Sequence, residues 1–392
     1  MVTSSESVDV QVIVTGGGAI GLASAWEVAR RGRSVLVLER FSRGHDRGSS
    51  AGLERQWRVQ YSEERWSRLA LETLPRWREL EAAGGRRLVH HTGSLWFGRP
   101  GVATSEGELR AAAAVMDRLD VPYDWLTAAE IEKRFGFVRL PAGHEGFYQA
   151  DGGVIDVRGT LATLAGLGAA AGVRVREHER VLAVEPDGTG VTVHTERAVH
   201  RAETVVVNAG ACGAELLRDL GCPVDLHVFR MSSGYFARRS AAVDPPTWYA
   251  FLEPDASGAN RSFYGFGSNP WTGGDLLRAA PDTEVPVTGP DPLAPHPPDA
   301  GDLARTADWV RAHLPFLIPE LTGASTCLAA LPADAARQFL IGSLAGRIPD
   351  GERIVVQAGG WAFKFVPAFG RICADLALDG HSTRHESATV LS

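Results

Sequence analysis

The sequence predicts a mixed α/β (α+β) fold, in which a Rossmann-like dinucleotide-binding domain is interleaved with a mixed-sheet substrate domain. A strand, a glycine-rich turn, a helix and a second strand follow one another in residues 8–39. Buried strands with glycine-rich ends recur in the middle of the chain, at 204–210, and near its end, at 353–360. Segments rich in β-forming residues lie between these regions, as expected when the chain returns repeatedly to one sheet.

The opening region carries a sequence signature of dinucleotide binding. Residues 8–14 predict a buried strand, 22–31 a helix and 34–38 a second strand. The turn between strand and helix reads Gly16-Gly17-Gly18-Ala19-Ile20-Gly21. Gly16 allows the tight turn, Gly18 lets the backbone approach a pyrophosphate, and Gly21 lets helix and strand pack closely. Glu39 can accept a hydrogen bond from a ribose 2′-OH and disfavours the 2′-phosphate of NADP, which leaves FAD and NAD open.

The remaining elements follow from hydrophobic periodicity and from glycine and proline. We expect small residues at 48–52 to leave room for the backbone of a cofactor. Helices are predicted over 62–83, 106–118, 127–134, from 156 to about 171, and over 367–378. Strands are predicted within 86–97, at 173–176 paired with 181–185, at 191–195 paired with 198–202, at 204–207 and at 353–357. Residues 281–298 hold seven of the 22 prolines and predict an irregular surface connection or lid.

The return of the chain to one sheet favours FAD over NAD, because nicotinamide enzymes normally keep the cofactor domain contiguous. We therefore expect a discontinuous FAD-binding domain at 8–85, 150–225 and 327–382. The substrate-binding domain is expected at 86–149 and 226–326.

Composition excludes several classes of protein. The hydrophobic fraction of 44% and the charged fraction of 22% are those of a globular chain and exclude a disordered one. Apolar runs are too short or too glycine-rich to span a bilayer, and residues 1–8 carry no secretory signal. A net charge of −7 argues against nucleic-acid binding. We expect a cytoplasmic monomer without membrane or nucleic-acid partners. The four cysteines form no spacing typical of a disulfide framework or a metal site.

One of the two lysines lies in an aromatic setting. Lys364 stands between a predicted strand end and a predicted helix start, the place where ligands bind in doubly wound sheets. Burying an ammonium without a partner is costly, so such a lysine meets an anion or has a lowered pKa. Two interpretations remain open. Lys364 is either a cation beside the cofactor ring or a side chain that extends from the helix edge to water.

These motifs together resemble the D-amino-acid oxidase superfamily of FAD-dependent oxidoreductases. The resemblance rests on the glycine-rich turn with Glu39, on residues 151–156 and on Asn208-Ala209-Gly210. Residues 325–328 and 359–365 are similar to the sarcosine oxidase branch. Residues 52–58, 93–98 and 361–367 resemble, within that branch, the flavin oxidases of nikkomycin biosynthesis, which convert piperideine-2-carboxylate to picolinate. The similarity extends from about residue 8 to 380 and implies a fold of the D-amino-acid oxidase type.

The resemblance also implies how the cofactor is held. FAD would be attached through its 8α-methyl group to Cys327, the cysteine that matches the family position. Together with the residues of the glycine-rich turn and Glu39, the implied cofactor-binding residues are Arg40, Ser49, Ser50, Arg55, Val181, Ala209, Gly210, Gly359, Gly360, Phe363 and Lys364.

Six residues match positions of the family's active site. Arg58 is assigned to the substrate carboxylate, because a guanidinium fork suits a planar carboxylate. Lys364 would then supply the positive charge that stabilises oxygen as it is reduced. Glu106 and Asp282 would move ring protons, although ordinary solvated acids remain the alternative. Tyr264 and Trp361 would form an aromatic wall.

The sequence also departs from the family pattern. Sarcosine oxidases carry a histidine where this chain has Ala51, and a lysine where it reads Leu276-Leu277. Losing that lysine puts oxidation of simple N-methyl amines in doubt and favours Lys364 as the oxygen partner. The expected activity is oxidation of a cyclic, lysine-derived imino acid with reduction of O2 to hydrogen peroxide. A sarcosine oxidase-like activity, a flavin dehydrogenase with another acceptor and a non-catalytic NAD-binding protein remain alternatives.

Overall fold

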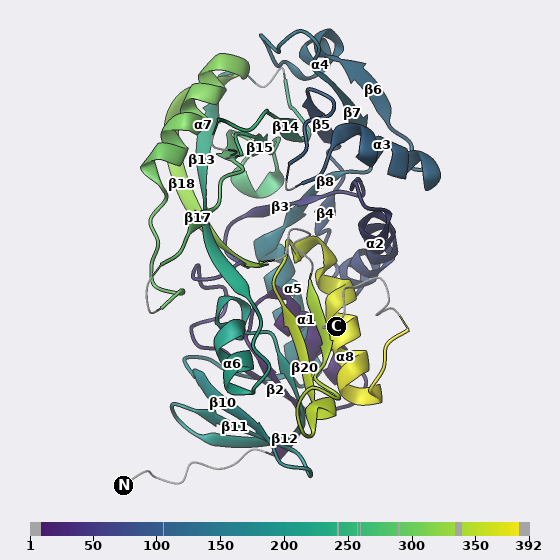
Figure 1. Cartoon of the computed structure of the whole chain (residues 1–392), viewed down its shortest axis with the longest axis vertical. Helices are drawn as coiled ribbons and strands as arrows, with labels where there is room; N and C mark the ends of the chain where they lie inside the picture. Colours follow the sequence, from purple (N-terminus) through teal and green to yellow (C-terminus); the bar gives the residue numbers. More distant parts are fainter. Residues whose placement is uncertain are drawn as a thin grey trace.

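The computed structural model describes residues 9–383, apart from 105, 241–242, 257, 259, 289–290 and 334–338. Two large sheets occupy opposite ends of the elongated molecule, with a small sheet and helix α2 (Glu64–Gly84) between them (Figure 1).

The first sheet is the predicted dinucleotide-binding sheet. In the order β10-β11-β12-β1-β2-β9, its strands are β10 (Val181–Pro186), β11 (Val191–Thr195), β12 (Val199–Val207), β1 (Asp9–Thr15), β2 (Val35–Leu38) and β9 (Arg174–Arg176). Strand β20 (Ile354–Ala358) pairs with β12, and β19 (Leu340–Ser343) pairs with β20. Strands β9, β2, β1, β12 and β20 run parallel, whereas the β10–β11 hairpin and β19 are antiparallel to their neighbours. The chain thus enters this sheet three times, as the sequence predicts.

Both faces of the first sheet are covered, which explains why its parallel strands are continuously apolar. Helices α1 (Ala19–Ala29), α5 (Val157–Ala170) and α8 (Val366–Asp379) pack together, with α1 in contact with the other two. Along β1, Val12 and Val14 belong to the core that contains these helices, whereas Ile13 belongs to the core on the opposite side. Helix α6 (Gly213–Asp219) contacts β10.

The second sheet forms the other end of the molecule. In the order β17-β13-β16-β15-β14-β5-β7-β6, its strands are β17 (Val285–Pro286), β13 (Leu226–Arg238), β16 (Leu276–Pro281), β15 (Phe263–Gly265), β14 (Thr247–Phe251), β5 (Ser94–Gly98), β7 (Glu145–Gln149) and β6 (Asp124–Thr127). The long strand β18 (Leu317–Pro332) also pairs with β13. Helix α7 (Ala300–His313) packs on β13, β16 and β18, and α3 (Leu109–Arg118) and α4 (Ala128–Phe135) lie near β5, β6 and β7.

A three-stranded antiparallel sheet joins the two ends. It consists of β3 (Glu54–Trp57), β8 (Gly153–Asp156) and β4 (Val89–His90). The single-turn helices are η1 (Gly210–Cys212), η2 (Pro270–Thr272), η3 (Gly351–Arg353) and η4 (Phe363–Phe365). Strand β18 continues through residues 326–327, where the sequence places a domain boundary. The division into two domains at the expected bounds therefore stays a prediction.

Three of the expected elements differ in the structure. Strands β9 and β10 do not pair; they lie at opposite edges of the first sheet, because β9 joins β2 and β10 joins β11. Residues 198–202 and 204–207 form one strand, β12, whose first half pairs with β11 and whose second half pairs with β20. The helix expected from 106 begins at Leu109, because Gly107 has a φ of +115° and the Glu108 side chain caps the helix by accepting from the amide of Ala111.

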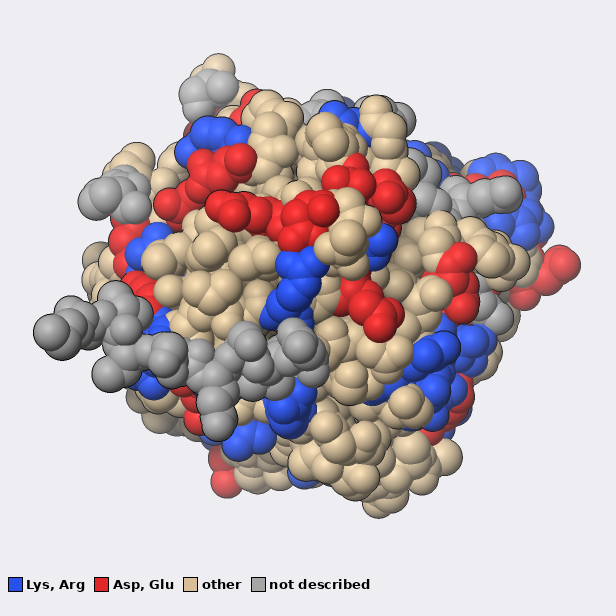
Figure 2. All heavy atoms as spheres, turned by 90° about the horizontal axis from the view of Figure 1, so that it is seen from below, with Lys and Arg blue, Asp and Glu red and all other residues tan. Residues whose placement is uncertain are grey.

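The surface carries mixed charge. Figure 2 shows one end of the molecule, where acidic and basic side chains are interspersed and no continuous basic tract forms on the visible part of this face. In the part of the chain that the structure describes, no helix is long and apolar enough to cross a membrane.

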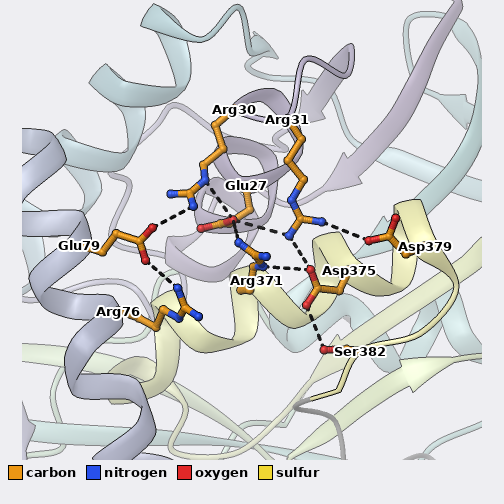
Figure 3. A network of polar contacts seen from close by, with 9 residues as sticks. All are labelled: Glu27, Arg30, Arg31, Arg76, Glu79, Arg371, Asp375, Asp379 and Ser382. Carbon is orange, nitrogen blue, oxygen red and sulfur yellow. Dashed lines mark hydrogen bonds and ion pairs between the residues drawn. The ribbon is translucent and has the colours of Figure 1, made fainter.

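A network of ion pairs ties α1, α2 and α8 together (Figure 3). Glu27 of α1 is buried, and its carboxylate lies 3.4 Å from Arg30 and 3.5 Å from Arg371 of α8. Arg371 also pairs with Asp375 at 3.0 Å, and Arg30 pairs with Glu79 of α2 at 2.9 Å. Burial raises the pKa of Glu27, and the neighbouring arginines oppose that shift. The network therefore links the C-terminal end of α1 to α2 and α8.

Substituting Gly21 should destabilise the protein. A Cβ atom at Gly21 would lie 2.0 Å from the carbonyl oxygen of Gly16, so Gly21→Ala must push α1 away from β1. Such overpacking costs about 1–3 kcal/mol of unfolding free energy. Gly166 of α5 is the matched control, because its Cβ would meet no atom within 4 Å. Gly166→Ala should raise the unfolding free energy by about 0.5–1 kcal/mol. Equal denaturation midpoints for the two variants would contradict this account of the turn.

Candidate active site

A deep cleft opens at the carboxyl ends of the parallel strands of the first sheet, where α/β proteins bind ligands. It encloses about 1500 Å³ of empty space that is open to solvent. Most of the predicted cofactor-binding residues line this cleft: Gly16, Gly18, Ala19, Ile20, Gly21, Glu39, Arg40, Ser49, Ser50, Val181, Ala209, Gly210, Gly359, Gly360 and Phe363. Gly17 lies beside it, with its amide donating to Glu39 at 2.7 Å.

The glycine-rich turn fits a dinucleotide pyrophosphate. Gly16 has a φ of +105°, and a Cβ there would lie 2.5 Å from the carbonyl oxygen of Asn208. A Cβ at Gly18 would approach only the Ser50 hydroxyl. Helix α1 begins after Gly18 without a side-chain cap and without an acidic residue in its first turn. The amide of Ala19 donates to the Ser50 hydroxyl at 3.0 Å, and the other N-terminal amides and the positive dipole end are directed toward the cleft, where they suit an anionic group.

Glu39 is fixed as a hydrogen-bond acceptor at the end of β2. Its carboxylate accepts from the amides of Gly17 and Phe41, at 2.7 and 2.8 Å, and lies 3.4 Å from His45. Burial raises the pKa of Glu39, but hydrogen bonds from His45 and from the two amides outweigh burial and hold the pKa below its usual value. Glu39 is thus an anion in the folded protein, as a ribose hydroxyl acceptor should be.

Arg40 lines the same cleft in a different setting from Glu39. Its two terminal nitrogens donate to the carboxylate of Asp291, at 2.8 and 3.2 Å, and one of them lies 3.8 Å from the sulfur of Cys212. Asp291 belongs to the proline-rich connection, which also brings Leu293 to the cleft. This part of the connection therefore reaches the cofactor cleft.

A second cavity adjoins the cleft, and Ser49, Gly360, Ala362 and Phe363 line both. It encloses about 870 Å³ of empty space, and its walls come mainly from the second sheet, from β3 and from the segment that follows β20. The structure brings all six predicted catalytic residues to this cavity: Arg58, Glu106, Tyr264, Asp282, Trp361 and Lys364. Three predicted cofactor-binding residues, Arg55, Cys327 and Lys364, also line this cavity and not the cleft. The two spaces together can hold a long cofactor next to a small substrate.

Arg58 and Glu106 form an ion pair in the cavity wall. Arg58 follows β3, is 4% exposed and binds the carboxylate of Glu106 through Nη2. Its guanidinium also lies over the rings of Tyr61 and Trp96, 4.7 and 4.9 Å from their centroids. Burial would lower the pKa of Arg58, but Glu106 and Tyr61 outweigh burial and raise it. The Nε–H of Arg58 is buried and has no partner in the described part of the chain.

Lys364 is buried in the same wall, so it does not extend to water. It is 8% exposed, and its ammonium lies 3.4 Å from the carbonyl oxygen of Trp361 and 5.6 Å from the ring centre of Tyr61. Burial and the positive charges of Arg58 and Arg55 lower the pKa of Lys364 to about 7, whereas Glu106 opposes this shift. Its charge therefore changes near neutral pH.

Asp282 faces the cavity from the end of β16. Its carboxylate accepts from the Tyr249 hydroxyl at 2.6 Å and from the Asn260 amide at 2.7 Å. Burial together with the charges of Asp282 and Glu106 raises the pKa of Tyr249 well above its usual value. Asp282 is almost fully buried, so it is no ordinary solvated acid.

Cys327 lies where the two spaces meet. Its sulfur is 2.9 Å from Nη2 of Arg55, and it pairs in register with Met231 across β13 and β18. The same Arg55 nitrogen donates to the carbonyl oxygens of Ser49 and Ala51 at 2.8 and 2.7 Å. The guanidinium therefore holds the thiol in place at the border of the two spaces.

Two of the cavity residues that are missing from the sequence-based set contribute to its hydrogen bonds. Arg278 is 6% exposed, and its terminal nitrogens donate to the Glu54 carbonyl oxygen at 3.1 Å and to the Tyr264 hydroxyl at 3.4 Å. It directly follows Leu277, so a cation does reach the cavity beside the position where the family's lysine is lost. Tyr249 is the other. The alternation of side-chain directions along a strand could have placed Arg278 and Tyr249 on an inward face. It could not have shown that they line this cavity.

Comparison with known proteins defines the family. Residues 11–376 match the family described as DAO, FAD dependent oxidoreductase. The chain is 31% identical, over 95% of its length, to a putative bifunctional amine oxidase of Dictyostelium discoideum, but spans only 36% of that protein. It is 31% identical to the monomeric sarcosine oxidase of Streptomyces avermitilis (95% of this chain, 94% of the relative) and 30% identical to the peroxisomal sarcosine oxidase of Homo sapiens (93% and 91%).

The chain belongs to the DAO family of FAD-dependent oxidoreductases. Its fold is that of this family, as the sequence predicts. The solved open form of NikD, described as an unusual amino acid oxidase essential for nikkomycin biosynthesis, superposes with a TM-score of 0.91 at 46% identity and covers 96% of each chain. A glycine oxidase from Geobacillus kaustophilus shares the fold, with a TM-score of 0.76 at 20% identity over 96% of each chain.

Replacing Lys364 should change how the stability of this DAO-family protein depends on pH. The pKa of Lys364 falls from 10.5 to about 7 on folding, so the unfolded chain binds a proton that the folded chain does not bind between these values. Wild-type stability should therefore fall as the pH falls from about 10 to 7, with no further loss from this group below pH 7. Lys364→Met should lose this component, and Lys133→Met on the exposed face of α4 should retain it. Parallel pH profiles of melting temperature for wild type and Lys364→Met would contradict the burial of a titrating amine.

Proposed function

We propose that this protein is a covalent-FAD oxidase that converts the cyclic imino acid piperideine-2-carboxylate to picolinate, reducing O2 to hydrogen peroxide. It would act as a monomer in the biosynthesis of a secondary metabolite. The observation that carries the proposal is the buried Arg58, paired with Glu106 beside Lys364, in an aromatic cavity that opens into the dinucleotide cleft. When bound, FAD supplies the acceptor for two electrons at a time.

Arg58 has the donors that a substrate carboxylate needs. Glu106 occupies Nη2, while the buried Nε–H has no partner in the described part of the chain. Buried donors without acceptors are rare in folded proteins, and a bound carboxylate would satisfy this one. The pairing with Glu106 keeps the guanidinium charged and fixed before substrate arrives.

The remaining cavity residues suit a flat ring that loses protons. Tyr264, Phe266 and Trp361 offer aromatic surface to such a ring. Conversion of piperideine-2-carboxylate to picolinate removes four hydrogens, which corresponds to two successive two-electron oxidations and two molecules of O2 reduced to peroxide. Glu106 and Asp282 are the carboxylates in reach of the cavity that can accept and release the ring protons. Lys364 supplies positive charge where oxygen is reduced.

The relatives support this proposal over its alternative. NikD, at 46% identity, is an amino acid oxidase of nikkomycin biosynthesis. The alternative is oxidation of a simpler secondary amine, which the sarcosine oxidase relatives at 30–31% identity favour. The absence of the family's lysine at Leu276-Leu277, with Arg278 in the cavity instead, separates this chain from that pattern.

A Cys327→Ala variant should test the covalent attachment. In wild-type protein precipitated with acid, the yellow colour should remain in the pellet, whereas Cys327→Ala should release it to the supernatant. Cys212→Ala is the matched control, because Cys212 lines the cofactor cleft 3.8 Å from Arg40 and should leave the colour in the pellet. Colour that stays with Cys327→Ala protein after precipitation, or an intact wild-type mass without an adduct, would contradict the linkage.

The substrate assignment should be tested by incubating the purified protein with piperideine-2-carboxylate. A pyridine absorbance band in the ultraviolet and two equivalents of hydrogen peroxide should appear together. Arg58→Met should lower kcat/KM by about 100-fold, because a charge-assisted hydrogen bond to the carboxylate is lost. Arg68→Met, on the exposed face of α2, should not lower it. Turnover of sarcosine without formation of picolinate from the imino acid would favour the alternative.

A further inference from the structure

The second cavity, in which the proposed function places the substrate, is called the substrate cavity below. A third cavity lies next to it and belongs to neither site described above. It encloses about 1480 Å³ of empty space, open to solvent. Residues of the 46–53 loop, the proline-rich connection and β18 line it. Among the described lining residues, Leu328 alone is shared with the substrate cavity, and none is shared with the cofactor cleft.

The polar side chains of this cavity are mainly hydrogen-bond donors. Arg158, an exposed residue in the first turn of α5, lines it and makes no hydrogen bond or ion pair with the described part of the chain. Tyr235 is 8% exposed, and its hydroxyl likewise has no partner among the described residues. Arg47 lines the cavity as well and uses one nitrogen to donate to the Leu293 carbonyl oxygen. The acidic residue here is Asp46, whose side chain is 94% exposed and whose carboxylate lies 3.8 Å from Nε of Arg47. Basic and hydroxyl donors outnumber acidic side chains in this lining, which favours a negatively charged ligand.

Apart from His296, Ser325 and Thr326, the rest of the lining is apolar. Leu53 and Leu328 form part of the wall, and Pro295, Pro297 and Pro298 present rigid apolar rings from the connection. A bare inorganic anion would leave this surface unused, whereas a carboxylate on an apolar body would satisfy the donors and bury the walls. We propose that the third cavity binds a small organic carboxylate, whose charged group meets Arg158, Arg47 and Tyr235.

A ligand in this cavity would lie directly behind the active site. Leu328 and Thr326 both line the third cavity and flank Cys327 along β18. Tyr235 pairs in register with Arg278, which lines the substrate cavity. The site goes beyond the proposed function, which assigns the substrate carboxylate to Arg58 in the other cavity. A ligand here would therefore contact residues that neighbour Cys327 and Arg278 in the strands β18 and β13.

Titration calorimetry of the holoenzyme with benzoate tests the inference. Wild type should bind two benzoates per chain, one at Arg58 and one in the third cavity. Arg158→Ala should weaken the second binding event by about tenfold or more, since a charged donor is lost. Tyr235→Phe should weaken it to a smaller extent. Arg174→Ala removes an exposed arginine that lines none of these cavities and should retain both sites. An unchanged melting temperature for Arg158→Ala would show that the loss is not due to unfolding.

The possible outcomes separate this inference from the proposed function. If Arg158→Ala still binds two benzoates with wild-type affinity, the third cavity is not a carboxylate site. A single site in wild type that disappears in Arg58→Met would overturn the inference and leave the proposed function standing. Binding of inorganic phosphate as tight as that of benzoate, lost in Arg158→Ala, would overturn the assignment of an organic ligand. No binding of benzoate to any variant would contradict both.

Discussion

The guanidinium of Arg55 holds together the place where the cofactor cleft passes into the substrate cavity. It donates to the carbonyl oxygens of Ser49, Ala51 and Glu54 and lies 2.9 Å from the sulfur of Cys327. These acceptors belong to the loop after β2, to β3 and to β18, so Arg55 links three parts of the chain. A lysine could not replace it, because an ammonium lacks the planar array of donors needed to reach four acceptors. The border between the cofactor cleft and the substrate cavity is therefore held by the hydrogen bonds of one side chain.

Charge in the substrate cavity is largely fixed. Arg58 and Arg278 stay protonated at any pH at which the protein is folded, and Arg55 adds a third guanidinium. Glu106 and Asp282 face them, each held by hydrogen bonds from named partners. Lys364 differs from these arginines. Its pKa of about 7 allows it to lose its positive charge near neutral pH. A cavity with four permanent cations would hold an anionic product more tightly, whereas Lys364 lets the charge fall as the pH rises.

The sequence predicts those parts of the molecule that local chemistry determines. The glycine-rich turn is an example, since Gly16 and Gly21 are required by contacts with neighbouring backbone, and Thr127 caps α4 through a capping box with Glu130. Strand partners depend on contacts far apart in the chain. For this reason the pairing of β9 with β10 was wrong although both strands exist. Arg278 was missed for the same reason: its strand was not predicted, and only the sheet register places it opposite Tyr235 and beside the substrate cavity.

Glu106 shows why the position of a candidate catalytic group can be predicted while its local structure is not. A helix beginning at 106 would tie the carboxylate to the first turn of α3. Instead Gly107 adopts a φ of +115° against Ser62, where a Cβ would lie 2.1 Å from the hydroxyl oxygen. Ser62 accepts from the amide of Glu108 at 2.8 Å, and Glu108 in turn caps α3. The chain is therefore held close to the segment that follows β3, and the residue before the glycine reaches Arg58. Any side chain at 107 would open this contact, so the ion pair depends on a backbone conformation that glycine adopts without strain.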